Sequence, residues 1–496
     1  MTAMAELTVA GVVVPHAEEV FVAGEWVPAE GGTFDVVSPS DGVVVASVGL
    51  PSVKQAESAI AAAREGLVSW AGSSVLQRVE VCRRFCAVLE DRLDDMGAVW
   101  AVEAGMPVRY SRGLHNIAAV SAWKTLLASA EDALLAERRR TALGEVLVLR
   151  EAAGVVAAIM AYNGPLVTVA SKVLPALLAG CSVVVKAAVE SQLIMRIVAE
   201  AASTAGFPAG VLSILCGDVE LGRTLVASPA VDMVSLTGGQ VAAQHIIDAT
   251  QGRFARTHLE LGGKSPAVIL DDADLAVTLK TLVPGATGGA GQVCALLSRI
   301  LVSEQRHDEV VEALRSAWQR LQIGNPLDPD TRVGPLTTRA ALERTEGFVA
   351  RAVAAGSTVV AGGARPVGFE AGWYYQPTLI TNVARDSDLA QNEVFGPVTA
   401  VLTYTDLDDA IRLANDTRFG LAASVYTADV EAGIECASRL EAGSVAINSF
   451  GPAITAPFGG VKGSGWGREA GPEGILEFTE LKQILIPSTE PRAEAQ

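Results

Sequence analysis

The sequence predicts an α/β protein built on a doubly wound parallel sheet. From Gly154 onward, short apolar runs typical of buried strands alternate with longer runs typical of helices. The strands are expected at 155–160, 182–185, 211–215 and 231–236, and the helices at 167–178, 191–204 and 220–227. In addition, 50% of the residues are hydrophobic, which is enough to bury strands on both faces. Because ligands of such sheets bind beyond the carboxyl ends of the strands, the turns after these strands are candidate binding turns.

The segments before this sheet predict a mixed N-terminal region. Residues 1–20 are weakly patterned and are expected to form an irregular lead-in. Residues 21–27 and 34–39 alternate apolar and polar side chains, as short strands do. Residues 53–67 and 75–95 repeat apolar side chains at helical spacing, and further helices are expected on either side of Gly105.

The segment from about Gly263 to Asn448 predicts a second α/β unit. Its helices are expected near 309–321, 338–355 and 406–415, and its strands near 358–361 and 398–404. A chain of 496 residues has room for about two or three domains, so a second unit is consistent with its length.

An exposed hairpin is predicted where the basic run 138–140 gives way to the apolar run 145–150. An apolar strand at a surface invites pairing with another chain, although an internal edge strand is the alternative. The late segment 477–484 is also strand-like. We interpret both segments as contacts between the subunits of a homodimer or homotetramer.

Composition excludes several classes of partner and compartment. The formal net charge of −18 argues against nucleic acids and anionic membranes, which need basic surfaces. The longest apolar run, 173–185, contains Pro175 and Gly180 and is shorter than the roughly 20 residues that span a bilayer. Residues 1–10 carry no basic start typical of a secretion signal. Six cysteines without a C-x-x-C pair fit a reducing compartment, so a cytoplasmic protein is expected, with no metal site.

A nucleophile and its base are predicted from two glycine-rich motifs. Cys294 ends the segment Gly288-Gly289-Ala290-Gly291-Gln292-Val293-Cys294, whose glycines disfavour regular structure and allow close approach of a substrate. Glu260 lies in Leu259-Glu260-Leu261-Gly262-Gly263. A thiol and a carboxylate on such turns suit nucleophilic catalysis with a general base. The alternatives are a buried structural cysteine and a surface charge.

Further motifs extend this pattern toward a known family. They lie at 161–165, 392–398, 415–423, 443–448 and 457–462. With the motifs around Cys294 and Glu260, they resemble the NAD(P)-dependent aldehyde dehydrogenases, in the family's order and over essentially residues 20–485. The resemblance implies that Cys294 attacks the aldehyde and that Glu260 later activates water.

The same resemblance assigns supporting catalytic roles. Asn163 would stabilise the oxyanion together with the backbone N–H of Cys294, whereas capping of the following helix is the alternative. Lys172 matches a lysine of a proton relay. Glu469 is a second candidate base, ranked below Glu260 because in the family it is usually structural or part of that relay.

The cofactor implied is NAD or NADP, and the resemblance assigns residues to it. Glu393 would hold the nicotinamide ribose, Phe395 would press on the nicotinamide ring, and Lys186 would bond the adenosine ribose. The remaining cofactor-binding positions are Tyr162, Gly222, Gly238, Gly239 and Leu261.

Departures from the family's pattern bear on cofactor and substrate. Val189 replaces the glutamate that commonly grips the adenosine ribose, and Glu190 is expected to point elsewhere, so NADP⁺ is expected to be accepted. Gly164 and Ser171 stand where many members carry aromatic rings, and Phe450 is the one aromatic of 449–456. Each ring lost removes about 150–250 Å² of lining, which predicts a bulky apolar, aromatic or terpenoid aldehyde.

Two alternatives remain beside aldehyde oxidation. A CoA-acylating enzyme is disfavoured by Glu260, because such members often lack this base, and a non-catalytic protein on the same fold is disfavoured by the intact Cys294. The family fold implies an NAD-binding domain, a catalytic domain and an oligomerisation hairpin. The NAD-binding domain would comprise 1–132, 153–262 and part of 463–496, the hairpin 133–152 with the tail, and the catalytic domain 263–462.

Overall fold

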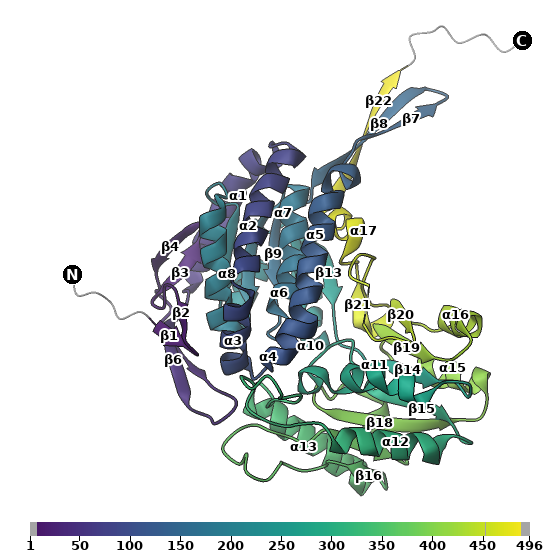
Figure 1. Cartoon of the computed structure of the whole chain (residues 1–496). Coiled ribbons are helices and arrows are strands. Elements are labelled where there is room, and N and C mark those ends of the chain that lie inside the picture. Colours follow the sequence, from purple (N-terminus) through teal and green to yellow (C-terminus); the bar gives the residue numbers. More distant parts are fainter. Residues whose placement is uncertain (1–6, 452, 488–496) are drawn as a thin grey trace, which may run out of the picture.

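The chain forms two lobes and a projecting arm (Figure 1). The structure is a computed structural model that describes residues 7–451 and 453–487. Each lobe is built on a large sheet, and a smaller three-stranded sheet forms the arm. Residues 1–6, which include most of the segment searched for a secretion signal, lie outside the described residues, as does the tail beyond residue 487. No helix among the described residues is long and apolar enough to cross a membrane.

The eight-stranded sheet of the first lobe is the predicted doubly wound sheet. Its order is β21-β13-β12-β9-β10-β11-β3-β4. The strands are β3 (Glu19–Val22), β4 (Glu25–Pro28), β9 (Val155–Ile159), β10 (Ser182–Ala187), β11 (Leu212–Cys216), β12 (Met233–Thr237), β13 (Arg256–Glu260) and β21 (Gly465–Trp466). The five strands from β13 to β11 are parallel, and the others are antiparallel additions at the edges. The winding reverses between β9 and β12, where such sheets bind ligands.

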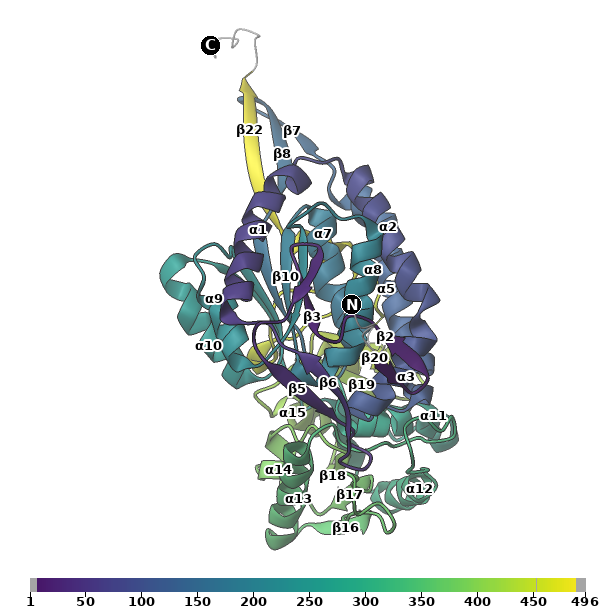
Figure 2. The same cartoon turned by 90° about the vertical axis from the view of Figure 1, so that its left-hand side faces the viewer.

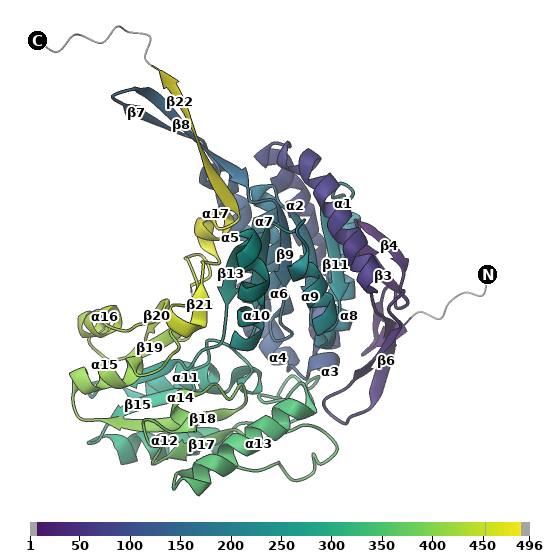
Figure 3. The same cartoon turned by 180° about the vertical axis from the view of Figure 1, so that it is seen from behind.

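Helices cover both faces of this sheet because its strands are apolar on both sides. In β9, Val156 and Ala158 face one core and Val155 and Ala157 face the other. The first core packs on α2 (Val75–Asp91), α3 (Leu93–Ala104), α5 (Asn116–Ala133), α7 (Leu174–Ala179) and α8 (Gln192–Ala205). The second packs on α1 (Val53–Ala71), α9 (Val219–Ala227) and α10 (Gln240–Thr250). Figures 2 and 3 show these two helical layers from the side and from behind.

The second lobe contains a seven-stranded sheet of order β16-β17-β18-β15-β14-β19-β20. Its strands are β14 (Pro266–Ile269), β15 (Arg299–Ser303), β16 (Thr358–Ala361), β17 (Thr378–Thr381), β18 (Val398–Tyr404), β19 (Ala422–Tyr426) and β20 (Ser444–Ile447). The helices are α11 (Leu275–Thr287) and α12 (His307–Gln319) on one face, with α13 (Arg339–Ala354), α14 (Asp388–Gln391), α15 (Leu407–Asn415) and α16 (Val430–Ser438) on the other. The expected second α/β unit is therefore present, although the exact domain boundaries remain a prediction.

The arm contains β7 (Glu137–Thr141), β8 (Gly144–Ala152) and β22 (Thr479–Pro487), in the order β22-β8-β7. The predicted hairpin and the late strand are both found. However, β8 pairs with β7 on one side and with β22 on the other within the same chain. Strand β22 covers one edge of β8 along its whole length, and β7 covers the other edge at 144–148, so the open part of β8 is limited to 149–152. The outer edges of β7 and β22 are open as well, and contact of the arm with another chain stays a prediction.

The N-terminal lead-in is more regular than expected. Leu7–Val9 (β1) and Val12–Val14 (β2) form a hairpin, and Thr33–Val37 (β5) pairs with Val44–Gly49 (β6). The turn of the first hairpin is made by Ala10 and Gly11, with φ of 52° and 78°. These left-handed values suit a two-residue hairpin turn. The hairpin was not predicted because its strands are too short to show a clear alternation of apolar and polar residues.

Two predicted helices are interrupted. The segment 75–95 divides at Arg92 into α2 and α3. The segment 167–178 is found as α6 (Pro165–Thr168), a π-helical turn η2 (Val169–Val173) and α7. A second π-helical turn, η1 (Ser111–His115), lies between α4 (Val108–Tyr110) and α5. Such turns occur often at functional sites, and η2 contains Lys172.

The remaining elements are short. They are the 3₁₀ turns η3 (Val189–Ser191), η4 (Gln251–Arg253), η5 (Gly288–Gly291) and η6 (Lys462–Ser464), and the helix α17 (Gly471–Leu476). Residues after the second lobe return to the first lobe as β21 and α17 and then enter the arm (Figure 3).

Candidate active site

The loop that carries Cys294 is an irregular turn at the end of α11. Within η5, Gly289 and Ala290 have φ of 57° and 53°, so the helix cannot continue. Cys294 follows without regular structure and is half-buried, whereas the other five cysteines are buried. The prediction that this cysteine lies in an accessible loop is consistent with that exposure.

Three separate motifs meet at this loop through close backbone contacts. A Cβ at Gly263 would lie 2.7 Å from the carbonyl oxygen of Cys294. A Cβ at Gly291, where φ is 79°, would lie 2.0 Å from the carbonyl oxygen of Gly396. Only glycine fits such contacts without moving backbone. The Glu260 turn and the Glu393–Gly396 segment are thereby packed directly against the Cys294 loop.

Asn163 and Tyr162 fasten the same loop from the carboxyl end of β9. The side-chain amide of Asn163 donates a hydrogen bond of 2.9 Å to the carbonyl oxygen of Gln292. The Tyr162 hydroxyl donates to Oε1 of Gln292 at 3.0 Å, and the backbone N–H of Thr337 donates to the same oxygen at 3.1 Å. An asparagine amide has two N–H donors, so Asn163 keeps one for a further acceptor beside Cys294. The sequence did not indicate the parts played by Gln292 and Thr337.

The Cys294 thiol is protonated in this resting arrangement. Burial raises its pKa to about 12, and the carboxylates of Glu260, Glu393 and Glu469 add to the effect. Only the backbone N–H of Ala295 opposes it. A nucleophilic thiolate therefore needs a proton acceptor or an added positive charge at the site.

Glu260 ends β13 inside the protein and has no hydrogen-bond partner for either carboxylate oxygen among the described residues. Its side chain is only 3% exposed. Burial, with Glu469 nearby, raises its pKa well above the usual range, while Lys172 and Arg468 act in the opposite direction. A carboxyl group with a raised pKa and free lone pairs is suited to take a proton near neutral pH.

A buried chain of polar side chains lies behind Glu260. Lys172 donates to Glu469 at 2.7 Å and to the hydroxyl of Ser235 at 3.1 Å. The Ser235 hydroxyl lies 2.9 Å from Nδ1 of His258, and Nε2 of His258 lies 4.0 Å from Oε1 of Glu260. Lys172 and Glu469 are thus brought together, as a relay requires.

His258 and Ser235 were missed by the sequence analysis. A signal existed, because His258 precedes Glu260 by two positions in one strand and so points to the same face. Ser235 is its cross-strand neighbour in β12.

Two of the expected cofactor residues, Tyr162 and Phe395, meet across the lobes. Their rings pack edge to face, with centroids 6.3 Å apart. Glu393 accepts a hydrogen bond of 3.0 Å from the backbone N–H of Gly263. Glu393 and Phe395 thus border the Cys294 loop from the second lobe, and Tyr162 borders it from the first.

The other expected cofactor residues lie near the carboxyl ends of β10, β12 and β13. Gly238 and Gly239 lead into α10, whose first turn has no side-chain cap, so its N–H groups are free for a phosphate. A Cβ at Gly239 would meet nothing within 4 Å, and the buried hydroxyl of Thr237 has no partner among the described residues. Gly222 lies on α9, and a Cβ at this position would also meet nothing within 4 Å. This region fits a dinucleotide pyrophosphate.

Lys186 and Leu261 complete that set. Lys186 ends β10, and burial lowers its pKa while the nearby carboxylate of Glu190 acts in the opposite direction. Glu190 therefore lies close enough to Lys186 to influence it. Leu261 is buried and its backbone N–H donates to Ser464 at 3.1 Å.

A cavity of about 890 Å³ opens beside the Cys294 loop; we call it the mouth cavity. Its lining includes Tyr110, Leu279, Gly288 and the expected Phe450. A Cβ at Gly288 would lie 3.4 Å from the Tyr110 ring, so the inner wall is formed by that pair. Gly164 and Ser171 do not line the mouth cavity, and Ser171 is buried. A Cβ at Gly164 would meet only Val167, at 3.8 Å, and a role of these two positions in a substrate pocket stays a prediction.

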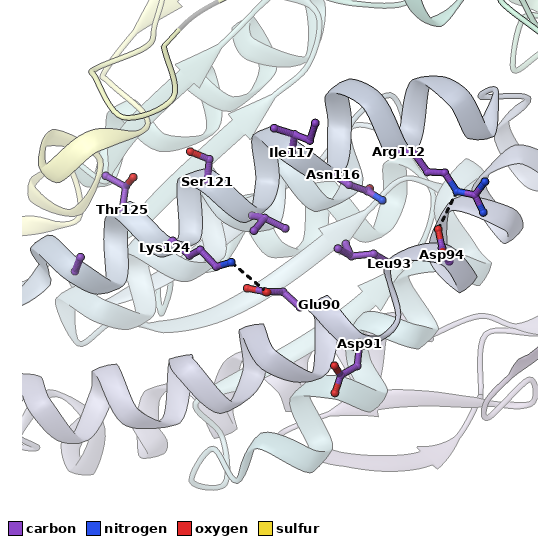
Figure 4. Close-up of a pocket in the computed structure, with 12 residues that line it drawn as sticks. Glu90, Asp91, Leu93, Asp94, Arg112, Asn116, Ile117, Ser121, Lys124 and Thr125 are labelled. Carbon is purple, nitrogen blue, oxygen red and sulfur yellow. Dashed lines mark hydrogen bonds and ion pairs between the residues drawn. The ribbon is translucent and has the colours of Figure 1, made fainter. Parts of the chain in front are cut away.

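A second hollow of about 900 Å³ lies away from Cys294, between α2 and α5 (Figure 4). It is crossed by the ion pairs Lys124–Glu90 and Arg112–Asp94. None of the expected site residues lines it. Among the described residues, no group of three or more His, Cys, Asp or Glu side chains could hold a metal ion.

Comparisons with known proteins agree with this geometry. The sequence profile of the "Aldehyde dehydrogenase family" matches residues 26–484. The chain belongs to the aldehyde dehydrogenase family. It is 35% identical to a geranial dehydrogenase of Castellaniella defragrans over 473 residues, which are 95% of this chain and 98% of that protein.

Solved structures give the same result. The crystal structure of a Mycobacterium tuberculosis aldehyde dehydrogenase complexed with NAD⁺ matches with a TM-score of 0.93 and 35% identity, over 96% of this chain and 99% of that one. Betaine aldehyde dehydrogenase of Staphylococcus aureus in complex with NAD⁺ matches with a TM-score of 0.93 and 31% identity, over 97% of each chain. The predicted family, fold and enzyme class, an oxidoreductase acting on aldehydes, are confirmed. The expected nicotinamide cofactor agrees with the ligand in both structures.

Proposed function

We propose that this aldehyde dehydrogenase oxidises an aldehyde to a carboxylic acid with NAD⁺ or NADP⁺, using Cys294 as the nucleophile and Glu260 as the general base. The observation that carries the proposal is the buried Glu260 carboxyl, which has no partner and a raised pKa, on the turn packed against Cys294. A carboxyl with only a structural role would be hydrogen-bonded.

The chain's residues account for each step. As the sulfur of Cys294 bonds to the aldehyde carbon, the proton of its thiol passes to water, and the free N–H of Asn163 with the backbone N–H of Cys294 stabilises the resulting oxyanion. When bound, the nicotinamide supplies the acceptor for the hydride that leaves this carbon. Glu260 then takes a proton from water, whose oxygen attacks the thioester and breaks the carbon–sulfur bond. Lys172 and Glu469 carry that proton away from the site.

The test is nicotinamide reduction by the wild type and by Cys294→Ala, with NAD⁺ and NADP⁺ separately. Loss of the nucleophile is expected to reduce kcat at least about 10⁴-fold. Cys436→Ala is a matched control, because Cys436 is buried in the second lobe away from the site. Turnover that survives Cys294→Ala, or that requires coenzyme A, would contradict the proposal.

A weak preference between NAD⁺ and NADP⁺ is expected from the turn after β10. Val189 in η3 carries no charge to repel a 2′-phosphate, whereas the next residue, Glu190, lies near Lys186. Acceptance of NADP⁺ is therefore expected, with Val189→Glu reducing kcat/KM for NADP⁺ more than for NAD⁺. Glu190→Gln is the informative second variant, because Glu190 lies near Lys186. No turnover with NADP⁺ at saturating aldehyde would contradict this expectation.

The aldehyde is proposed to be bulky and largely apolar, aromatic or terpenoid. The supporting observations are the volume of the mouth cavity and the missing side chain at Gly288. The name of the geranial dehydrogenase relative, which refers to a terpenoid aldehyde, points the same way. Gly288→Phe should lower kcat/KM for bulky aldehydes and leave acetaldehyde turnover within about twofold. Better kcat/KM on acetaldehyde than on any bulky aldehyde in the wild type would exclude this class.

A homodimer or homotetramer held by the arm, in the cytoplasm, is the proposed state of the protein. Apolar side chains are exposed on the arm, namely Leu143, Leu481, Ile484, Leu485 and Ile486. Exposed apolar groups of this kind mark interfaces. Leu481→Asp with Ile484→Asp should reduce the molecular mass measured by light scattering, whereas an unchanged mass would place the interface elsewhere.

A further inference from the structure

The rim of the mouth cavity carries positive charge only. Its lining contains Arg109, Lys280, Arg320 and Arg332, and no aspartate or glutamate. The chain as a whole has 56 acidic and 38 basic residues, so a lining with four cations and no acid runs against its composition. All four side chains are exposed. Among the described residues, none of them has a carboxylate partner within 4.0 Å or a side-chain hydrogen bond.

These cations come from four separate segments that converge on one opening. Arg109 lies in α4, Lys280 in α11, Arg320 directly after α12, and Arg332 in the loop that precedes Val333. Elsewhere on the surface the basic residues of the same helices are paired; Arg315 of α12, for example, binds Glu312 at 2.6 Å. The nearest acids in sequence to Arg332 are Asp328 and Asp330, which do not line the cavity. The positive rim is therefore uncompensated.

Apolar side chains line much of the same cavity. Leu279, Val283, Phe450 and the exposed Leu114 belong to this lining, and Tyr110 and Gly288 lie at its end beside the Cys294 loop. Hydroxyl groups contribute the remaining polar lining, namely those of Thr281, Thr287, Thr331 and Ser449. A substrate that fills the cavity would place its aldehyde at the inner end, its apolar body along the apolar side chains and its far end among the cations. Charge of one sign around an opening attracts ligands of the opposite sign and raises their rate of association.

From this arrangement we infer that the enzyme selects amphipathic aldehydes, in which an apolar or aromatic body separates the aldehyde from a carboxylate or similar anionic group. The inference rests on the proposed oxidation at Cys294 and narrows its substrate class. Arginines suit this task because their guanidinium groups bind carboxylates with two parallel hydrogen bonds.

The test compares 4-formylbenzoate with 4-methylbenzaldehyde, which have the same shape and differ in charge. We expect kcat/KM to be at least about 10-fold higher for the carboxylate at low salt, with the preference shrinking as salt screens the rim. The double variant Arg320→Gln with Arg332→Gln should remove most of the preference and leave kcat/KM for 4-methylbenzaldehyde unchanged. Arg315→Gln removes one positive charge from α12 outside the cavity and is the control for the single variant Arg320→Gln, which should lose part of the preference.

The outcomes separate the two proposals. Equal or better use of 4-methylbenzaldehyde, or a preference that the double variant and salt leave unchanged, would overturn the inference while aldehyde oxidation stands. No nicotinamide reduction with either compound or with acetaldehyde would instead overturn the proposed function. An equal loss of preference in Arg315→Gln would also overturn the inference, because net charge and not the rim would then be responsible.

A second inference comes independently from the polar chain behind Glu260. Lysine can only donate, so the hydroxyl of Ser235 accepts from Lys172 and its own hydrogen is available for Nδ1 of His258. This places the proton of a neutral His258 on Nε2, the atom that faces Glu260 and has no partner among the described residues. The separation of 4.0 Å closes to a hydrogen bond if the Glu260 side chain turns slightly.

We propose that His258 is a positioning residue that donates a hydrogen bond from Nε2 to Glu260. This bond stabilises the ionised form of Glu260, which takes the proton from water. The charged groups around the pair are Lys172, Arg256, Arg468 and Glu469. Burial and these cations lower the pKa of His258 well below its usual value, which keeps the ring neutral. A neutral ring with a fixed tautomer is a donor whose direction does not change with pH.

The test is the pH profile of kcat for His258→Leu and His258→Gln. Without the donor, the acid limb, which reports ionisation of Glu260, should move to higher pH in His258→Leu. His258→Gln retains an N–H donor and should restore part of the shift. KM for the cofactor should not change. A purely structural role predicts lower Tm with an unmoved acid limb, and that result, or equal profiles for both variants, would overturn the proposal.

Discussion

The two carboxylates that flank the Cys294 loop differ in how they are satisfied. Glu260 is 3% exposed and neither of its oxygens has a partner among the described residues. Glu393 is half-buried, accepts a hydrogen bond from the backbone N–H of Gly263, and has Lys264 and Arg344 nearby. Burial raises the pKa of both carboxyl groups, and the backbone of Gly263 opposes the change at Glu393 as that of Gly460 does at Glu260. Of the two, only the Gly263 N–H makes a hydrogen bond of ordinary geometry.

This difference separates a reactive group from a binding group. A buried acceptor without a hydrogen-bond partner destabilises the folded protein by about 1–3 kcal/mol. Such groups are retained at sites where a side chain has to gain and lose a proton. A carboxylate that accepts a hydrogen bond from a backbone N–H keeps its orientation and its charge. Such a group is suited to accept a hydrogen bond from a hydroxyl of a bound ligand. Under the proposed mechanism, the first lobe supplies the carboxyl group that reacts, and the second lobe supplies the one that binds the cofactor.

The largest effect is expected from Glu260→Gln. Removing the base should lower kcat about 10²–10⁴-fold, while the first turnover, which forms the thioester, still occurs. Rapid-mixing measurements should show a burst of reduced nicotinamide followed by a near halt, and mass spectrometry should find the acyl group on Cys294. A steady rate close to that of the wild type would remove Glu260 from the reaction.

Glu393→Gln should act mainly on the cofactor. Loss of one charge-assisted hydrogen bond is worth about 1.5–3 kcal/mol, which corresponds to a rise in cofactor KM of about 10-fold or more. The aldehyde KM should change little. If this variant instead accumulates the acyl-enzyme, as Glu260→Gln does, then the distinction between the two carboxylates is wrong.

The smallest effect concerns the Cys294 thiol itself. Glu260 is the first of the charged groups that raise its pKa, followed by Glu393. Removing either negative charge should lower the thiol pKa, so alkylation by iodoacetamide at a fixed pH below that pKa should become faster, and more so in Glu260→Gln. The expected shift is below about one unit, because burial is the main cause. Slower alkylation in both variants would show that the carboxylates assist the thiolate.

The proposed reactive residues have local signals in the sequence, and their roles remain a prediction. Cys294 and Glu260 each follow from a few consecutive residues. The alternation of 155–237 predicted the parallel sheet that β13, with Glu260 at its end, extends, whereas Cys294 lies in the loop after α11. The supporting contacts could not be predicted. Gln292 is held by Tyr162, Asn163 and Thr337, which come from distant segments, and only tertiary packing brings them together.

The same limit applies to the arm. The edges of β8 were expected to be open because the sequence does not show that β22 returns to the same sheet. The short pattern gave the type of element correctly but could not give its neighbours. Gly164 and Ser171 do not line the mouth cavity, and their role in a substrate pocket stays a prediction.

The pairing of Lys172 with Glu469 bears on how the protein is made. The two residues are 297 positions apart, and β21 and β22, which complete the first sheet and the arm, come from the same late part of the chain. At about 5–20 residues per second, the ribosome needs roughly 15–60 s between these residues. During that time the first lobe holds a lysine without its counterion and open strand edges. Unpaired strand edges make an incomplete chain prone to aggregation, and in this protein the last strands to be made cover them.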